Sequence, residues 1–228
     1  MNKTTTKGGG IVHTPKIELI ERAASNILRF EIERPDGFSF VPGNAVMIGV
    51  PDSGEDPGPF CPTSDPADAC LEFFIKIYRE RDGLTDRIEN CLVGDTLTMS
   101  DPFGDIEFQD TGVFLAAGAG ITPFLAILRQ LDAEGVAGGN QLHYTESNRM
   151  DLVQEEEFRQ ILGNDAHFVL TKDDFNPQRL DSDYLDEEVK VSDDNFYYLC
   201  GPPGFETDLV DWLVGKGIQD DKIVREDR

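Results

Sequence analysis

The spacing of apolar residues divides the chain near residue 110. Before that point apolar and charged residues alternate, as at Leu28, Phe30 and Ile32 and again over 71–77, which is the two-residue period of a half-buried strand. Turn-forming Pro, Gly and Asp residues separate these runs. Strands joined by turns predict an antiparallel barrel or sandwich, interrupted by one short helix over Thr85–Cys91.

From Gly112 onward short apolar runs alternate with amphipathic segments. The expected strands are Val113–Ala117, Gln141–Thr145, His167–Thr171, Phe196–Cys200 and Lys222–Val224. The expected helices follow Thr122, span Leu152–Leu162 and carry Phe205, Leu209, Trp212 and Leu213 on one face. This order predicts a parallel sheet covered by helices, and hence a β domain over 11–110 followed by an α/β domain over 111–228.

The composition changes this picture through its charge. A formal net charge of −24 in 228 residues repels nucleic acid and anionic membranes, so we expect neither as a partner. The acids occur along the whole chain, with short clusters at Glu155–Glu157 and Asp220–Asp221. They would either keep the protein soluble in high salt or steer a basic partner, and we favour the first interpretation.

Other compositional features narrow the class of protein. No apolar run is long enough to cross a bilayer, and the first ten residues lack a signal core, so we expect a cytoplasmic monomer. The four cysteines are widely spaced, without a Cys-x-x-Cys pair. We therefore expect reduced thiols and no metal site.

The segment Gly118–Pro123 joins the first parallel strand to its helix and is the first candidate binding site. Gly118 and Gly120 permit a sharp turn and close approach of a ligand to the backbone. Thr122 suits the N-cap and Pro123 the first helical position. The free N–H groups at such a helix start are typical of a pyrophosphate site.

A second glycine-rich strand end, Leu199–Gly204, belongs to the same carboxyl edge of the predicted sheet. Taken alone, Cys200 is read as a small buried residue and the Gly-x-Gly turn as a structural feature. Two such segments at one edge favour a nucleotide site.

These segments, in this order, resemble the ferredoxin–NADP⁺ reductase family, and most closely its short bacterial flavodoxin reductase and flavohaemoglobin-reductase-like members. The similar segments are Phe38–Asn44, Pro59–Ser64, Gly83–Thr85, Val93–Asp95, Pro102–Gly104, Gly118–Pro123 and Cys200–Pro202. The second resembles the flavin motif Arg-x-Tyr-Ser/Thr-x-x-Ser. The last two match the nicotinamide motifs Gly-x-Gly-x-x-Pro and Cys-Gly-Pro.

The resemblance implies a six-stranded antiparallel flavin barrel, a nucleotide domain and FAD in the cleft between them. The flavin contacts it implies are Phe60 on the ring, Cys61 near its N5, Pro62 and Thr63 of the same motif, Lys76, Ile77 and Tyr78 along the ring and ribityl chain, and Gly83, Leu84 and Thr85 at the phosphate. The nicotinamide contacts it implies are Gly118, Gly120, Ile121, Thr122, Pro123, Cys200, Gly201 and Pro202. Cys61, Thr122 and Cys200 would be the catalytic residues, which hold the nicotinamide C4 against N5 for hydride transfer.

The chain departs from the family pattern on the flavin side. Gly58 stands where the flavin motif has its arginine, Phe60 replaces the usual tyrosine and Cys61 replaces Ser or Thr. Arg79, Arg81 or Arg87 would have to reach the flavin phosphate instead. If none does, we expect weak flavin binding or a preference for FMN. Glu226 resembles an acid near the family's C-terminus.

The choice of coenzyme depends on the segment after the second strand of the sheet. Ser147 and Arg149 would hold the 2′-phosphate of NADPH, whereas Glu146 would accept a hydrogen bond from the free 2′-hydroxyl of NADH. In so acidic a chain, Arg149 is also read as a solvated loop residue. We favour NADPH and leave NADH open.

The sequence thus predicts a flavin-dependent NAD(P)H oxidoreductase that passes electrons to a separate acceptor. The family expectation is ferredoxin or flavodoxin, but these are usually acidic and would be repelled at low salt, so free flavin or a quinone is the other expectation. The alternative is a degenerate flavoprotein that serves as a redox sensor or an electron-transfer subunit, which the missing arginine motivates.

Overall fold

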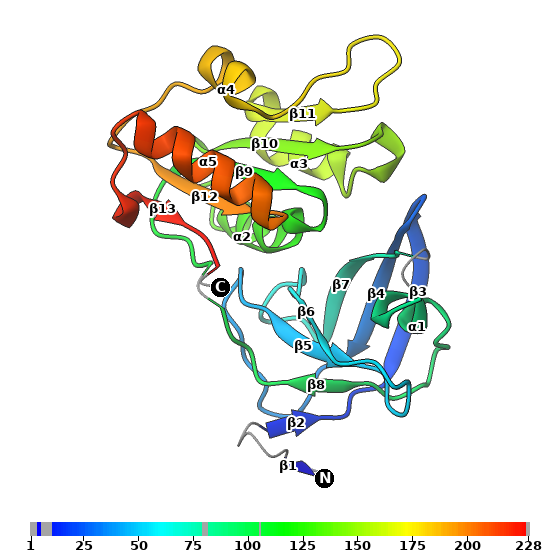
Figure 1. The fold of residues 1–228 in the computed structure, drawn as a ribbon. Coiled ribbons are helices and arrows are strands. Elements are labelled where there is room, and N and C mark those ends of the chain that lie inside the picture. Colours follow the sequence, from blue (N-terminus) through cyan, green and yellow to red (C-terminus); the bar gives the residue numbers. More distant parts are fainter. Residues whose placement is uncertain (1–3, 6–10, 79–81, 105, 227–228) are drawn as a thin grey trace.

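The computed structural model describes residues 4–5, 11–78, 82–104 and 106–226. Arg79 and Arg81, two of the arginines expected at the flavin phosphate, lie outside these residues. Antiparallel strands form the N-terminal part and a helix-covered parallel sheet the C-terminal part, with the two parts packed together (Figure 1). The predicted fold class, β followed by α/β, is therefore confirmed.

The N-terminal strands form two antiparallel sheets, with orders β1-β2-β8-β5-β6 and β3-β4-β7. The strands are β1 Thr4–Thr5, β2 Ile11–His13, β3 Ile17–Ala24, β4 Ile27–Glu33, β5 Val46–Gly49, β6 Gly58–Phe60, β7 Cys70–Lys76 and β8 Thr98–Ser100. The helix α1, Leu84–Glu89, lies between β7 and β8. It begins one residue before the predicted helix Thr85–Cys91 and ends two residues before it.

Isolated backbone hydrogen bonds join the two sheets into a barrel. Beside β3, the Ile17 N–H donates to the Asp95 carbonyl at 2.9 Å, and the Leu97 N–H donates to the Pro15 carbonyl at 2.9 Å. Beside β7, the Thr63 N–H donates to the Glu72 carbonyl at 2.8 Å. With β2 and β3 taken as one bent strand, this closes the six-stranded antiparallel barrel.

Strand β7 is buried on both faces, unlike an ordinary barrel strand. Phe73 and Ile75 enter the barrel core, together with Phe30 and Ile32 of β4. Phe74, on the other face, joins the core of the α/β part, as does Ile27 of β4. The core of the α/β part therefore extends onto the outer face of the barrel. The predicted alternation of apolar and charged residues fails in β7 because the α/β part covers this second face of the strand.

The parallel sheet has the strand order β11-β10-β9-β12-β13. Its strands are β9 Gly112–Ala117, β10 Gln141–Glu146, β11 Ala166–Leu170, β12 Phe196–Cys200 and β13 Ile223–Val224. Its helices are α2 Thr122–Ala133, α3 Glu155–Leu162, α4 Ser182–Glu188 and α5 Pro203–Gly215. Residues of α2 and α3 share a core with one face of the sheet, and residues of α4 and α5 share a core with the other.

Two helices differ from the prediction. Helix α3 begins at Glu155 rather than Leu152, because a 3₁₀ turn over Arg149–Asp151 comes first and Gln154 adopts the left-handed conformation at φ 51°. Helix α4 was not predicted. Of its seven residues only Leu185 is buried, so the segment has no repeating apolar positions from which a helix could be recognised. None of the helices in the described ranges is long and apolar enough to cross a membrane.

A stacked histidine pair lies under α4 and makes the α/β core sensitive to acid. His143 is fully buried, its ring lies 4.5 Å from that of His167, and its Nδ1 is 3.0 Å from the Tyr184 hydroxyl. Burial, with a further contribution from His167, lowers the pKa of His143 from 6.5 to about 3. Between these values the unfolded chain binds a proton that the folded chain excludes, so stability falls as the pH falls through this window.

We predict that His143→Gln flattens the pH dependence of the free energy of unfolding between pH 6.5 and about 3. One excluded proton contributes about 1.4 kcal/mol per pH unit. Urea unfolding at several pH values in this range measures the free energy of unfolding of the native and variant proteins. Because the carboxylates titrate in both proteins, their contribution cancels in the difference between the two. His167→Gln, which changes the partner ring, should flatten it less. Equal slopes in the native protein and His143→Gln would contradict the assignment.

Candidate functional site

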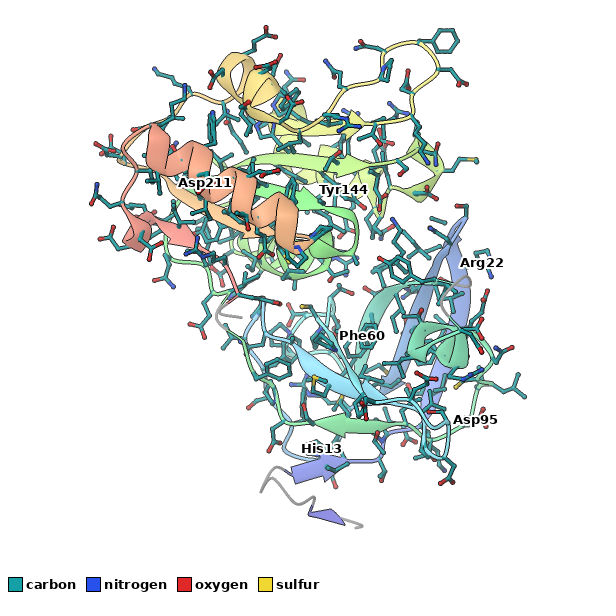
Figure 2. The ribbon with its side chains drawn as sticks, in the orientation of Figure 1. His13, Arg22, Phe60, Asp95, Tyr144 and Asp211 are labelled. Atoms are coloured by element: carbon teal, nitrogen blue, oxygen red, sulfur yellow. The ribbon has the colours of Figure 1, made fainter. Side chains whose placement is uncertain are left out.

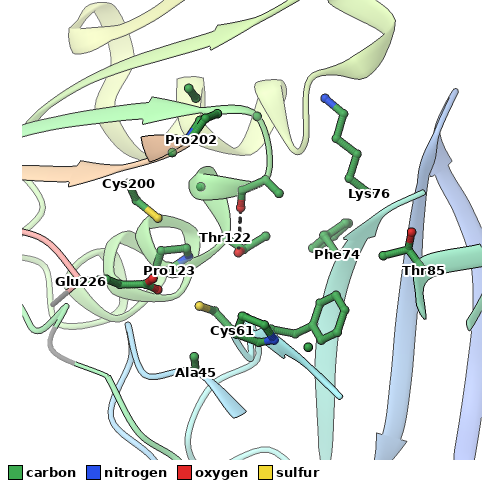
Figure 3. A pocket seen from close by; sticks show the side chains of 18 of the residues that line it. Ala45, Cys61, Phe74, Lys76, Thr85, Thr122, Pro123, Cys200, Pro202 and Glu226 are labelled. Atoms are coloured by element: carbon green, nitrogen blue, oxygen red, sulfur yellow. Dashed lines mark hydrogen bonds between the residues drawn. The ribbon is translucent and has the colours of Figure 1, made fainter. Parts of the chain in front are cut away.

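A cavity of about 650 Å³ opens where the carboxyl edge of the parallel sheet meets the barrel (Figure 3). Both parts of the molecule line it. The barrel contributes Ala45, Gly58, Pro59, Phe60, Cys61, Phe74, Lys76, Tyr78, Gly83, Leu84 and Thr85. The nucleotide part contributes Ala117, Gly118, Ala119, Gly120, Thr122, Pro123, Cys200, Gly201, Pro202, Pro203 and Glu226. The volume is in the range usual for small-molecule sites.

The two glycine-rich loops touch through their backbones. Gly118 has φ 60°, a left-handed conformation that favours glycine. A Cβ on Gly120 would lie 2.2 Å from the Cys200 carbonyl oxygen, so only glycine permits this approach. A Cβ on Gly201 would lie 2.6 Å from the Phe205 ring and 3.0 Å from the Ala117 Cβ. The glycines thus hold β9 and β12 together at the cavity.

The start of α2 differs in detail from the expected cap. Gly118–Ile121 forms a 3₁₀ turn, so the N-cap is Ile121, and Thr122 and Pro123 lie within the first helical turn. The Thr122 hydroxyl donates to the Ala119 carbonyl at 3.0 Å instead of accepting a helix N–H. This hydrogen bond closes the 3₁₀ turn and leaves the hydroxyl oxygen beside the cavity (Figure 3).

The three residues expected to be catalytic, Cys61, Thr122 and Cys200, line one part of the cavity together with Glu226 (Figure 3). Burial, and after it the negative charge of Glu226, raises the pKa of the Cys61 thiol to about 12, while a hydrogen bond with Thr122 acts in the opposite sense. The thiol is therefore protonated at neutral pH. Sequence reasoning had only the family resemblance to indicate Glu226, because a C-terminal acid has no local signature.

On the barrel side the cavity is lined by Phe60, Lys76, Tyr78 and the segment Gly83–Thr85, and Figure 2 shows Phe60 on the barrel face turned toward the α/β part. Three other residues expected there, Pro62, Thr63 and Ile77, do not line it. The Thr63 hydroxyl donates to Glu72 at 2.8 Å, and Ile77 belongs to the barrel core. Ile121, which was expected to contact the nicotinamide, also does not line the cavity and belongs to the core of the α/β part.

The end of the Leu84 side chain crowds the position of the missing arginine and would have to shift to admit a side chain there. A Cβ on Gly58 would lie 2.9 Å from the Leu84 side chain. Arg87, the remaining described candidate, forms ion pairs with Asp82 at 3.0 Å, Asp86 at 3.7 Å and Glu55 at 3.8 Å, and it does not line the cavity. Among the described residues that line the cavity, Lys76 is the only cation.

Ion pairs cross between the two parts of the molecule beside and behind the cavity. The Lys76 ammonium contacts both carboxylate oxygens of Glu146, at 2.6 and 2.8 Å. Farther away, the Arg129 guanidinium donates to Glu72 and to the Thr63 carbonyl, both at 2.7 Å, and to Glu157. The Ser25 hydroxyl donates to the Asp151 carboxylate at 2.5 Å.

The residues expected at the adenosine end of the coenzyme lie outside the cavity lining. Arg149 is exposed and forms an ion pair with Glu155 at 2.5 Å. Glu146 is buried and bound to Lys76. Ser147, at the end of β10, is half-buried. Within the part of the chain that the structure describes, no group of His, Cys, Asp and Glu side chains is arranged to hold a metal ion.

Comparison with known proteins agrees with this arrangement. Residues 114–211 match the model of the oxidoreductase NAD-binding domain. The anthranilate 1,2-dioxygenase electron transfer component of Acinetobacter baylyi is 24% identical over 92% of this chain, which spans 64% of that protein. The propane 2-monooxygenase reductase component of Rhodococcus jostii is 23% identical over 86% of this chain, which spans 57% of that protein. The chain is thus shorter than these relatives.

Among solved structures, a ferredoxin NADP⁺ reductase from Neisseria gonorrhoeae with bound FAD and NADP superimposes with a TM-score of 0.78 at 22% identity, covering 90% of this chain and 92% of the other. The similarity includes both the barrel and the parallel sheet. Together with the match to the oxidoreductase NAD-binding domain over residues 114–211, this similarity shows that the chain has the two-part fold of that reductase.

Proposed function

We propose that this chain is a flavin-dependent NAD(P)H oxidoreductase that passes electrons from the nicotinamide to a separate acceptor. One observation carries the proposal: a single cavity is lined on one side by the barrel segments that resemble the flavin motifs and on the other by both glycine-rich strand ends. A site built from both parts suits a reaction between two bound cofactors, because it brings their reactive atoms together.

The cavity suits a flavin ring better than a flavin phosphate. The half-buried Phe60 offers a flat apolar face, and Tyr78 and Leu84 continue the wall. At the phosphate end, Gly83–Thr85 offers backbone N–H groups but no described arginine. Phe60, Tyr78 and Gly83–Thr85 would hold the flavin, and we expect FAD or FMN to bind weakly.

The bound cofactors would supply the hydride chemistry, and the chain's own residues would supply orientation. Gly118 and Gly120 leave the backbone open to the coenzyme, and Thr122 and Cys200 flank the place where its nicotinamide would lie. The neutral Cys61 thiol adds no second negative charge beside Glu226. The half-buried Glu226 borders both the cavity and a neighbouring groove along α5, where it would accept a hydrogen bond from a ligand.

We propose NADH as the coenzyme. Arg149, which lies between β10 and α3, is paired with Glu155, and α3 opens with three glutamates, Glu155–Glu157. A 2′-phosphate in this region would meet more negative than positive charge. The charge balance around the Arg149–Glu155 ion pair favours NADH, whereas the sequence alone favoured NADPH.

The acceptor is proposed to be a separate molecule, as the names of the two oxygenase components suggest for those proteins. With a net charge of −24, an acidic protein acceptor would dock only where salt screens the repulsion. A small acceptor, such as a free flavin or a quinone, carries far less charge than an acidic protein and is repelled less.

Anaerobic reduction tests the proposed function. The protein in about molar salt with added FAD or FMN should lose absorbance near roughly 450 nm, a property of the flavin, on addition of NADH and more slowly with NADPH. Gly120→Ala should abolish this bleaching but not bleaching by dithionite, because the new Cβ would press on the Cys200 carbonyl. Gly138→Ala, whose Cβ meets nothing within 4 Å, is the matched control. If the protein binds neither FAD nor FMN, the proposed reductase function is wrong. If it binds a flavin that neither NADH nor NADPH reduces, the alternative of a redox sensor or electron-transfer subunit is favoured.

The missing arginine generates a second prediction. Gly58→Arg combined with Leu84→Ala, which removes the side chain 2.9 Å from the new Cβ, should bind FAD about tenfold more tightly than Leu84→Ala alone. Fluorescence titration of FAD measures both dissociation constants. Gly58→Gln with Leu84→Ala controls for bulk without charge. Equal affinity with Arg and Gln would show that charge at this position does not limit flavin binding.

The state of Cys61 generates a third prediction. Because its thiol stays neutral up to a pKa of about 12, Cys61→Ser should leave the pH profile of flavin reduction by NADH unchanged between about pH 7 and 10. Cys61→Ala, which removes the polar group beside Thr122, should slow the step. Stopped-flow single turnovers measure both. An alkaline limb that is present in the native protein and absent in Cys61→Ser would mean that the thiol ionises in this range.

A further inference from the structure

The ion pair between Lys76 and Glu146 joins the ends of two strands from different parts of the molecule. Lys76 ends β7 of the barrel and Glu146 ends β10 of the parallel sheet. The ammonium is 2.6 and 2.8 Å from the two carboxylate oxygens, and the side chains are only 15% and 3% exposed. With so little water around it, the pair is weakly screened.

The pair lies directly beneath the glycine loop. Lys76 and Glu146 border a small space closed by Phe74, Thr122 and Val153, and Lys76 also lines the main cavity. A Cβ built on Gly118 would be 3.9 Å from both the Lys76 Nζ and the Glu146 Oε1. An anionic group resting on the backbone of this loop would therefore be close to both charges.

Glu146 is held in place by more than Lys76. One carboxylate oxygen accepts the Ser147 N–H at 3.1 Å, and the other accepts the Tyr144 hydroxyl at 3.5 Å. Lys76 is the only cation among the described residues that line the cavity. A pyrophosphate at the glycine loop and the fixed Glu146 carboxylate would thus compete for one ammonium.

We propose that Glu146 is a built-in competitor of the coenzyme. On this view, which rests on the proposed function, the coenzyme pyrophosphate takes Lys76 from Glu146, so the ion pair between barrel and sheet opens when the coenzyme binds. The pairs centred on Arg129 and on Asp151 do not border the cavity and stay closed. Glu146 thereby lowers coenzyme affinity and couples coenzyme binding to one contact between the two parts.

The test measures binding of ADP-ribose, which carries the pyrophosphate without the nicotinamide, by calorimetry at low salt. Glu146→Gln keeps the shape and removes the charge, and it should tighten binding about tenfold. Lys76→Met should weaken binding by a similar factor, and Glu146→Gln should have no effect in the Lys76→Met background. Glu72→Gln weakens the ion pair with Arg129, which also joins the barrel to the sheet part but lies away from the cavity, and is the matched control, expected to leave binding unchanged.

The outcomes separate this inference from the proposed function. Equal affinities for the native protein and Glu146→Gln, or equal tightening by Glu72→Gln, would overturn the competition while leaving the reductase intact. If the native protein binds no ADP-ribose but the Glu146→Gln variant does, the result would support the competition. Absence of binding in both would overturn the competition and the proposed function together. FAD affinity should be the same in the native protein and Glu146→Gln, and a change there instead of in ADP-ribose affinity would assign Lys76 to the flavin.

Discussion

The burial of both faces of β7 is the constraint on which the rest of the structure depends. Phe73 and Ile75 complete the barrel core, while Phe74 is embedded in the core of the α/β part. Exposing a residue of this size would cost about 1.5–3 kcal/mol, so the two parts are held against each other by the same strand. The strand carries Lys76 at its end, and this position brings a barrel cation to the glycine loop of the sheet.

Close backbone contact at the sheet edge follows from that packing. Gly120 lies against the Cys200 carbonyl and Gly201 against Ala117 and Phe205, so the loops that follow the paired strands β9 and β12 pack closely at the cavity. This contact leaves Thr122 and Cys200 on one wall of the cavity and Cys61 on the facing barrel segment. The polar centre is thus assembled from three separate parts of the sequence, with Glu226 as a fourth.

Electrostatics sets the character of the site. In a chain of net charge −24, carboxylates engage four of the described cations: Lys76 contacts Glu146, Arg129 contacts Glu72 and Glu157, Arg87 contacts Asp82, and Arg149 contacts Glu155. Under the proposed function, phosphate groups of the flavin or the coenzyme would meet cations that already have partners. This arrangement favours moderate affinity for anionic ligands, and it makes the internal acids determinants of binding.

The sequence by itself determined most of the elements and the two glycine-rich strand ends that line the cavity. Alternation and helical period are local properties, so β4, β9, β12 and α2 could be read from them, and glycines at Gly118, Gly120 and Gly201 report a backbone requirement at their own positions. The family resemblance supplied the barrel and the cofactors. The division after Asp110 and the individual roles of the site residues stay predictions.

Only the tertiary structure decided how the parts interact. It placed Thr63 on Glu72 rather than in the cavity, packed the Leu84 side chain close to Gly58, and brought Glu226 beside Cys61. It also paired Lys76 with Glu146, 70 residues apart in the chain. Such contacts leave no periodic signal, because each depends on which strand ends meet at one edge, and the packing of the two parts around β7 sets that arrangement.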